Sequence, residues 1–185
     1  MSAQAADRPF VWNVAGLLGD TVGADRTYDI ADATIELPEE LILAEPISGH
    51  VRLIHTNRGV LAQARLQTAL ATECVRCLRP TTAPLDLRID DEFLPSRDLT
   101  TGKPVPVDEE PEALRLTDHH ELDLERSVWD AISLAEPIAP LDRPDCPGLC
   151  PTCGLPFDEG VHDHPDDDID PRLEALRGFK VETSD

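Results

Sequence analysis

The sequence predicts an α+β fold that is β-rich, with an antiparallel sheet containing a long hairpin, few short helices and a C-terminal zinc knuckle. Three observations lead to this prediction. Apolar residues recur at every second position along residues 60–70 and 85–89, which is the period of a half-buried strand. The 17 prolines favour short elements over a long helical bundle. Two CxxC pairs, far apart in the chain, have the spacing of zinc ligands.

The first expected element is a short strand at residues 9–14. The glycine-rich segment 16–23 is interpreted as a turn, because it lacks the Gly-Lys-Ser/Thr ending of a phosphate loop. A strand from residue 47 to 53, a tight reversal at 57–59 and a return strand over 60–70 form the predicted hairpin. A helix is the alternative for the Ala/Gln-rich return segment, but a strand that leads directly into the first cysteine pair is favoured.

The following elements are shorter. Residues 85–93 predict a strand that pairs with the hairpin, and residues 95–112, rich in proline and acid, predict a loop. A short strand is expected at 121–124. A helix is expected at 125–135, with Asp123 as its cap and its apolar side formed by Val128, Trp129, Ile132 and Leu134.

The C-terminal segment is expected to close the fold. Pro137 and Pro140 end the preceding helix, and the sequence DPRLEALRGF predicts a last short helix with Leu173, Leu176 and Phe179 at helical spacing. We therefore expect two units. Residues 1–136 form a β-rich body with an acidic loop near 95–118, and residues 137–185 form a zinc knuckle and a short helix packed on that body.

Charge limits the choice of partner. The 185 residues include 37 acidic and 16 basic side chains, giving a formal net charge of -21. Such an excess repels a phosphate backbone, so broad electrostatic binding of RNA or DNA is disfavoured. Two interpretations remain: a basic protein partner, or an acidic surface that only keeps the protein soluble.

The cysteine count indicates metal ligands. The N-terminal residues show neither a basic start nor an unbroken apolar run, which predicts a cytoplasmic protein without a membrane segment. In that reducing compartment, five clustered cysteines are more typical of metal or redox groups than of structural disulfides.

The two CxxC pairs are Cys74 with Cys77 and Cys150 with Cys153, and this spacing lets two thiolates approach one tetrahedral zinc ion. CxxC is also a thiol redox motif. It then needs the N-terminus of a helix to lower a thiol pKa, and Pro80 leaves no room for a long helix after the first pair. Zinc is therefore the favoured interpretation.

Further candidate ligands are Cys146, His162 and His164, and they leave two ligand schemes open. In the favoured scheme one all-thiolate site joins the two CxxC pairs, and Cys146 is spare. In the alternative, the second CxxC pair binds one ion with His162 and His164, while the first pair binds a second ion with Cys146 and either Asp142 or water. The two histidines can also be ordinary exposed side chains of an acidic loop.

An enzyme is not expected. Closed sulfur-rich ligation leaves no coordination position for water, which makes a zinc site structural. The triplet Asp118-His119-His120 is similar to the motif of the DHH phosphoesterases, but the additional aspartate clusters of those enzymes are missing, and no GxSxG elbow occurs. The sequence therefore indicates no catalytic residue, and we expect no small-molecule substrate.

Five motifs resemble the bacterial YceD family of large ribosomal RNA subunit accumulation proteins. They are TNRGV, ECVRCL, ELDLERSVWDAISLAEPIAPL, CPGLCPTCG and DPRLEAL, and the resemblance extends from about residue 10 to residue 180. It implies a role in accumulation of 23S rRNA and in biogenesis of the large ribosomal subunit. In similar family members the HDH position often reads Cys-x-Cys, which implies that His162 and His164 are ligands.

These observations give one favoured function and two alternatives. The favoured hypothesis is a zinc-stabilised, non-enzymatic factor that binds a large-subunit precursor, either through a ribosomal protein or through 23S rRNA. Arg76 and Arg79, with Arg52, Arg58 and Arg65, are candidates for a basic contact patch, although they can also be ordinary solvated arginines. The alternatives are a cytosolic CxxC thiol redox protein and a regulatory protein-binding module.

Overall fold

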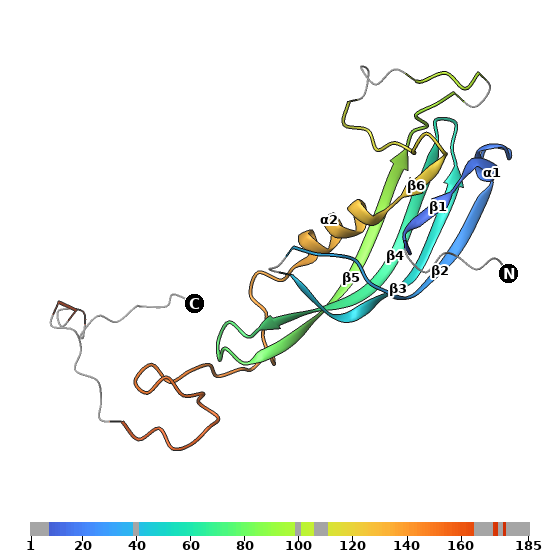
Figure 1. Cartoon of the computed structure of the whole chain (residues 1–185). Coiled ribbons are helices and arrows are strands. Elements are labelled where there is room, and N and C mark those ends of the chain that lie inside the picture. Colours follow the sequence, from blue (N-terminus) through green and yellow to red (C-terminus); the bar gives the residue numbers. More distant parts are fainter. Residues whose placement is uncertain are drawn as a thin grey trace, which may run out of the picture.

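The structure is a computed structural model that describes residues 8–38, 41–98, 101–105, 111–164, 172–173 and 176. Its elements, in chain order, are β1 (Val11–Asn13), α1 (Ala15–Leu18), β2 (Asp25–Ala33), β3 (Ile42–His55), β4 (Val60–Glu73), β5 (Pro80–Phe93), β6 (Glu121–Asp123) and α2 (Glu125–Ala135). The predicted β-rich character, with antiparallel sheets and few helices, is confirmed in this arrangement (Figure 1).

The main sheet has the strand order β2-β3-β4-β5, and every neighbouring pair is antiparallel. β4 pairs with β5 from Val60 opposite Phe93 to Glu73 opposite Pro80 without a break in register. The strands β1 and β6 form a separate antiparallel pair. Because sequential strands lie next to one another, the turn between β4 and β5 falls at one end of the sheet, and it contains Cys74 and Cys77 (Figure 1).

The core lies on one face of this sheet. Along β4, Val60, Ala62, Ala64 and Leu66 are buried, as the period of two predicts, and α2 packs against β5 on the same side. The opposite face of β4 and β5 carries polar pairs, in which Gln63 and Gln67 donate hydrogen bonds to Asp90 and Asp86. A single covered face explains why the apolar alternation is so clear in these strands.

β2 is absent from the elements that the sequence predicts. Its buried residues are only Ile30 and Ala33, and its register shifts between them. An edge strand with so few buried side chains lacks the alternation by which strands are found. β3 and β5 also begin earlier than expected, at Ile42 and Pro80.

The expected turn at residues 16–23 is partly wrong. Residues 15–18 form the single helical turn α1, whose Leu17 and Leu18 are buried in the core. Gly16 inside this short element and Gly19 at its end hid it, because glycine disfavours helix.

The helix α2 has the predicted bounds, but its N-cap is Leu124 and not Asp123, and no side chain caps it. Asp123 lies one residue earlier, where its carboxylate accepts a hydrogen bond of 3.1 Å from the backbone N–H of Glu125. The predicted apolar side is wrong at Leu134, and Trp129 is only partly buried and lies outside the core cluster. Val128 and Ile132 are buried, whereas Leu134 is 88% exposed. Positions four apart share a helix face, but position 134 is two residues from 132 and lies outside the buried face, in a groove beside the edge of β5.

Two predictions concern segments that the structure describes only in part. Most of the predicted last helix, 170–179, lies outside the described residues. In the acidic loop, isolated bridges join Leu94 to Arg115 and Arg97 to Pro104. Within the part of the chain that the structure describes, no helix is long and apolar enough to cross a membrane.

Candidate metal centres

The first candidate centre is built on the turn between β4 and β5. The backbone N–H of Leu78 donates to the carbonyl of Cys74, which closes the turn and places the thiols of Cys74 and Cys77 together. The segment after α2 returns to this turn, where the N–H of Val75 donates to the carbonyl of Pro140. This return brings Asp142 and Cys146 to the same point.

Four ligand atoms of Cys74, Cys77, Asp142 and Cys146 all lie within 4.8 Å of one another, and the three cysteines are buried. The sulfurs of Cys74 and Cys146 are 3.7 Å apart, and Cys74 Sγ lies 3.4 Å from an Asp142 oxygen. Around a tetrahedral zinc ion, two sulfurs lie about 3.8 Å apart, and a sulfur and an oxygen about 3.5 Å. The geometry therefore fits a shared ion.

The chemistry of this donor set also fits a cation. Burial alone would raise the pKa of Cys74, but backbone N–H groups of Asp142, Cys77 and Arg76 outweigh it and lower that pKa to about 7. Burial and the neighbouring Asp142 carboxylate raise the pKa of Cys146 to about 12. Three thiols and a carboxylate in one buried cluster cannot all ionise without a counter-ion, and a divalent metal supplies that charge.

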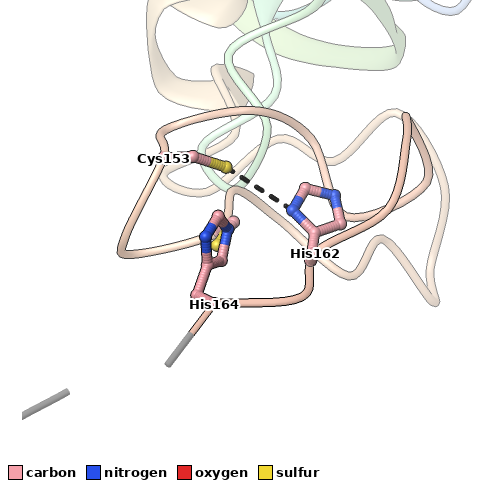
Figure 2. A group of neighbouring side chains, drawn as sticks. Cys153, His162 and His164 are labelled. Carbon is pink, nitrogen blue, oxygen red and sulfur yellow. Dashed lines mark hydrogen bonds between the residues drawn. The ribbon is translucent and has the colours of Figure 1, made fainter. Parts of the chain in front are cut away.

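The second candidate centre lies in the loop that follows. Its four ligand atoms, from Cys150, Cys153, His162 and His164, also lie within 4.8 Å of one another. The N–H of Gly154 donates to the carbonyl of Cys150, closing a turn in which Gly154 has a φ of 72°. Figure 2 shows Cys153, His162 and His164 converging, with Cys153 Sγ 3.5 Å from His162 Nδ1.

The two histidines are oriented as ligands. The Nε2–H of His162 donates to the carbonyl oxygen of Pro156 at 3.0 Å, and the other ring nitrogen, Nδ1, faces Cys153. His164 Nε2 is buried without a hydrogen-bond partner within the described residues. Backbone N–H groups of Cys153 and Thr152 lower the pKa of Cys150 to about 6, against the opposing effect of burial. Each of these features suits metal ligation.

The structure thus separates the two CxxC pairs into different groups. This arrangement differs from the favoured single site and follows the alternative scheme, with Asp142 beside Cys146 and the first pair. The physical reason is the contact between Val75 and Pro140, which holds the segment before Cys146 at the β4–β5 turn, while the second pair closes its own loop.

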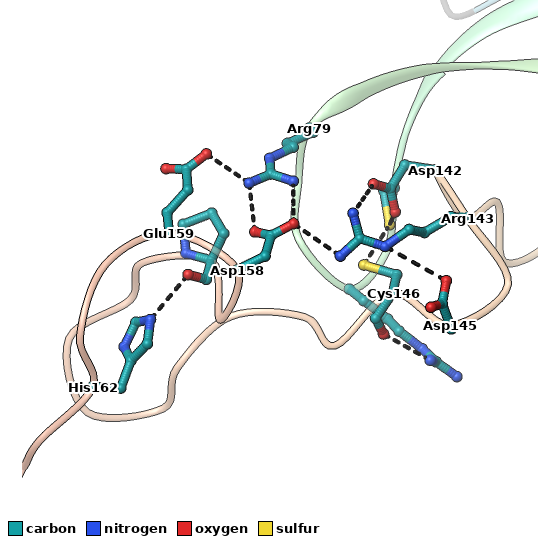
Figure 3. Close-up of polar contacts among 11 residues, drawn as sticks. Arg79, Asp142, Arg143, Asp145, Cys146, Asp158, Glu159 and His162 are labelled. Carbon is teal, nitrogen blue, oxygen red and sulfur yellow. Dashed lines mark hydrogen bonds and ion pairs between the residues drawn. The ribbon is translucent and has the colours of Figure 1, made fainter.

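An ion-pair network connects the two groups, and Figure 3 shows it. Arg79 donates to both carboxylate oxygens of Asp158, at 2.9 and 2.6 Å, and to Glu159 at 2.6 Å. Arg143 donates to Asp158 at 2.8 Å. These contacts tie the β4–β5 turn and the segment of the first group to the loop of the second. Sequence reasoning missed Arg143 and Asp158, because no local spacing signals a contact between such distant residues.

The five arginines of the predicted contact patch all have neighbours within the chain. Arg76 donates to the carbonyl of Cys146 at 2.9 Å, and Arg79 belongs to the ion-pair network. The remaining three lie beside acids: Arg52 beside Asp25, Arg58 beside Glu92 and Arg65 beside Asp90. A role of these arginines in partner contact stays a prediction.

The DHH triplet belongs to neither candidate centre. Asp118 pairs with Arg97 at 2.8 Å and accepts a hydrogen bond from Ser96. Within the described residues, the only groups of cysteine, histidine and acid close enough to share a metal are the two described above.

Comparison with known proteins identifies a family. The model of the family described as "Large ribosomal RNA subunit accumulation protein YceD" matches residues 62–180, a segment that contains both candidate metal centres. No solved structure matches the chain.

The similar curated proteins are mycobacterial. The chain is 36% identical over 130 residues to an uncharacterized protein of Mycobacterium tuberculosis, covering 68% of this chain and 58% of that protein. It is 33% identical over 137 residues to an uncharacterized protein of Mycobacterium leprae, covering 71% of this chain and 59% of that protein. The chain therefore spans about three fifths of the length of these relatives.

Proposed function

Because the chain belongs to the YceD family of large ribosomal RNA subunit accumulation proteins, we propose that it is a non-enzymatic factor in biogenesis of the large ribosomal subunit. The family match over residues 62–180 is the observation that carries this proposal. In it, the protein acts in the cytoplasm, supports accumulation of 23S rRNA and binds a ribosomal protein or another assembly partner. The net charge of -21 favours a basic protein over bare RNA as the direct contact.

The two candidate centres support a structural role for zinc. In our proposal, Cys74, Cys77, Asp142 and Cys146 hold one ion, and Cys150, Cys153, His162 and His164 hold a second. Four protein ligands complete a tetrahedron, so no position is left for a reacting water. The ions would then fasten the segment 137–164 to the end of the sheet and thereby fix the surface that a partner meets.

A thiol redox function is the competing proposal, and the local structure argues against it. The first CxxC pair lies in a turn between two strands, and within the described residues no helix begins at either pair. A redox CxxC relies on a helix N-terminus to stabilise its thiolate. Tightly bound zinc with thiols protected from alkylation would separate the two functions.

The test of the main proposal is a ribosome profile. In a strain that lacks the gene, sucrose-gradient sedimentation should show fewer large subunits relative to small subunits, and the amount of 23S rRNA relative to 16S rRNA should fall. Expression of the full chain should restore both ratios. A normal subunit ratio and normal 23S rRNA in the deletion strain would contradict the proposal.

A further inference from the structure

A groove runs between the outer edge of the sheet and the helix α2. It has a volume of about 510 Å³ and is lined by consecutive residues 86–91 of β5 and by one face of α2. The helix contributes residues at helical spacing, among them Asp130, Ala131 and Leu134. Because consecutive strand residues line it, the groove follows the backbone edge of β5 and not only one face of the sheet.

The backbone of this edge is free to pair. β5 is the last strand of the sheet, and among the described residues no backbone hydrogen bond joins residues 85–92 to any element other than β4. Pro84 lacks an N–H, so the uninterrupted row of outward backbone groups begins at Leu85. The segment 114–116 pairs with the edge at Leu94, where the N–H of Leu94 donates to the carbonyl of Leu114 and the N–H of Leu116 donates to the carbonyl of Leu94. An added strand can therefore pair only with the part of β5 between Pro84 and Leu94.

The other edge of the sheet differs. In β2 the register shifts between Ile30 and Ala33, and Asp32 has a positive φ of 55°. Such an irregularity bends an edge and hinders strand addition. β5 pairs with β4 without a register shift along its whole length. Strand addition is therefore favoured at β5.

The charge of the groove selects the incoming strand. Four acidic residues line it, Asp86, Asp90, Asp91 and Asp130, against the single arginine Arg88. The carboxylates of Asp86 and Asp90 lie at the sheet edge on the face away from α2, where they accept hydrogen bonds from Gln67 and Gln63. Asp90 and Asp130 have exposed arginine neighbours, at 3.4 and 3.1 Å, which are weak pairs that a new cation can replace at small cost. A second copy of this acidic chain and a nucleic acid are both repelled here, whereas a lysine- or arginine-rich segment is attracted.

We propose that this groove binds an extended basic segment of a partner protein, which adds to β5 as a further strand. Its backbone would pair with residues 85–92, its cationic side chains would meet the carboxylates, and its apolar side chains would contact Ala131 and the 88% exposed Leu134. The inference rests on the proposed function and deepens it, because it names the class of partner through which the factor would act.

The test uses the full zinc-loaded chain and fluorescence anisotropy of labelled peptides. The probe is a short peptide of alternating lysine and valine. It should bind with an affinity that falls as the salt concentration rises. Two control peptides should bind at least about tenfold more weakly: alternating glutamate and valine, which reverses the charge, and the basic peptide N-methylated at alternate residues, which cannot complete the backbone ladder.

Matched variants locate the binding site. Asp130→Lys lies on the exposed side of α2 and should weaken binding of the basic peptide by about tenfold. Asp29→Lys makes the same charge change on β2, at the opposite edge of the sheet, and should leave the affinity within about twofold. Circular dichroism of both variants verifies that the fold is retained.

Several outcomes would overturn the inference: equal binding to wild type and Asp130→Lys, equal binding of the N-methylated peptides, or no binding of the basic peptide. Preferential binding of a single-stranded RNA oligonucleotide would do so too, since it would make nucleic acid the ligand. None of these results changes the ribosome profile of the deletion strain. The groove and the proposed function can therefore fail separately.

Discussion

At the scale of single residues, the two zinc-binding schemes differ in which side chains share an ion. Cys146 discriminates between the two schemes, because it is spare in a single all-thiolate site but lies 3.7 Å from Cys74 in the structure. Asp142 likewise belongs to the first group of ligands in the structure but is not a ligand in the single all-thiolate site. Substitution of Cys146 or Asp142 therefore removes a zinc ligand in the two-ion scheme and leaves zinc binding unchanged in the single-site scheme.

We predict that wild-type protein binds two zinc ions and that Cys146→Ser binds one tightly, because the first centre loses a ligand. His164→Ala should also bind one ion tightly, through loss of a ligand from the second centre. Zinc content measured by mass spectrometry after dialysis checks this. His119→Ala, a histidine outside both groups, serves as the control and should retain two ions. One ion in both the wild type and Cys146→Ser would favour the single all-thiolate site.

The ion-pair network gives a second prediction at this scale. Asp158→Asn removes the carboxylate that accepts from both Arg79 and Arg143, so the loop of the second centre should be held less firmly. The two partners Arg79 and Asp158 are 31% and 30% exposed, which suggests a loss on the order of 1 kcal/mol. Hydrogen exchange of residues 147–164 would measure it as faster exchange.

The control for this variant is Asp145→Asn. Asp145 also pairs with Arg143, at 3.5 Å, but its side chain is 88% exposed. Its removal should leave exchange in the loop nearly unchanged, because an exposed pair contributes little. Equal acceleration in both variants would show that the network does not hold the loop.

At the scale of elements, burial decides which residues matter. The sequence predicted the bounds of α2 correctly but placed Leu134 on its apolar side. The structure buries Val128 and Ile132 against the sheet and leaves Leu134 in the groove beside β5. Periodicity finds a helix readily, but the width of its buried face depends on what packs against it.

We predict that Ile132→Ala lowers the free energy of unfolding by about 2–5 kcal/mol, because it leaves a cavity under α2. Leu134→Ala, the same kind of truncation on the same helix, should change stability by less than about 0.5 kcal/mol, because the side chain is exposed. Urea denaturation of the two variants checks the difference. A similar loss of stability in both variants would show that Leu134 is buried on the apolar side of α2, as its periodicity predicted.

A glycine in β3 gives a further prediction for an element. Gly49 has a φ of 142°, and a β-carbon there would collide with the carbonyl oxygen of Arg65 in β4. Gly49→Ala should therefore destabilise the protein by at least about 1–3 kcal/mol. Gly19→Ala, where φ is -82° and a β-carbon meets only ordinary contacts, is the control and should be nearly neutral. Thermal unfolding of both variants provides the comparison, and an equal response would contradict it.

At the scale of the whole molecule, the buried residues form two separate clusters. The large one joins the sheet to α1, α2 and the β1–β6 pair. The small one contains Cys74, Cys77 and Cys146, with Leu141 and Leu149 against it. Because the cysteines contribute nothing to the large cluster, the sheet and the metal-binding end should respond differently to loss of metal.

We predict that a strong chelator releases the segment 137–164 from the sheet while the strands persist. Loss of zinc should speed hydrogen exchange in residues 137–164 and in the β4–β5 turn, because the ligands are then held only by the small cluster and by polar contacts. Exchange in the centres of β3 and β4 should change little, and far-ultraviolet circular dichroism should retain its strand signal. Cooperative unfolding of the entire chain on chelation would contradict this division.

The sequence by itself determined the elements whose signal is local. The period of two in residues 60–70 predicted the strand β4, the bounds of α2 followed from its helical pattern, and CxxC spacing singled out Cys74, Cys77, Cys150 and Cys153. Each signal spans only a few residues. The backbone geometry of a single strand, helix or turn is enough to place those residues on one face or in one turn.

Only the tertiary structure decided how distant segments combine. It grouped Asp142 and Cys146 with the first cysteine pair, joined Arg79 to Asp158, added the edge strand β2 and opened a groove between β5 and α2. These features depend on where the chain returns after α2, and that path is set by burial of α2 on the sheet and by the turn that meets Pro140. No local spacing contains this information, because the contacts join residues far apart along the chain.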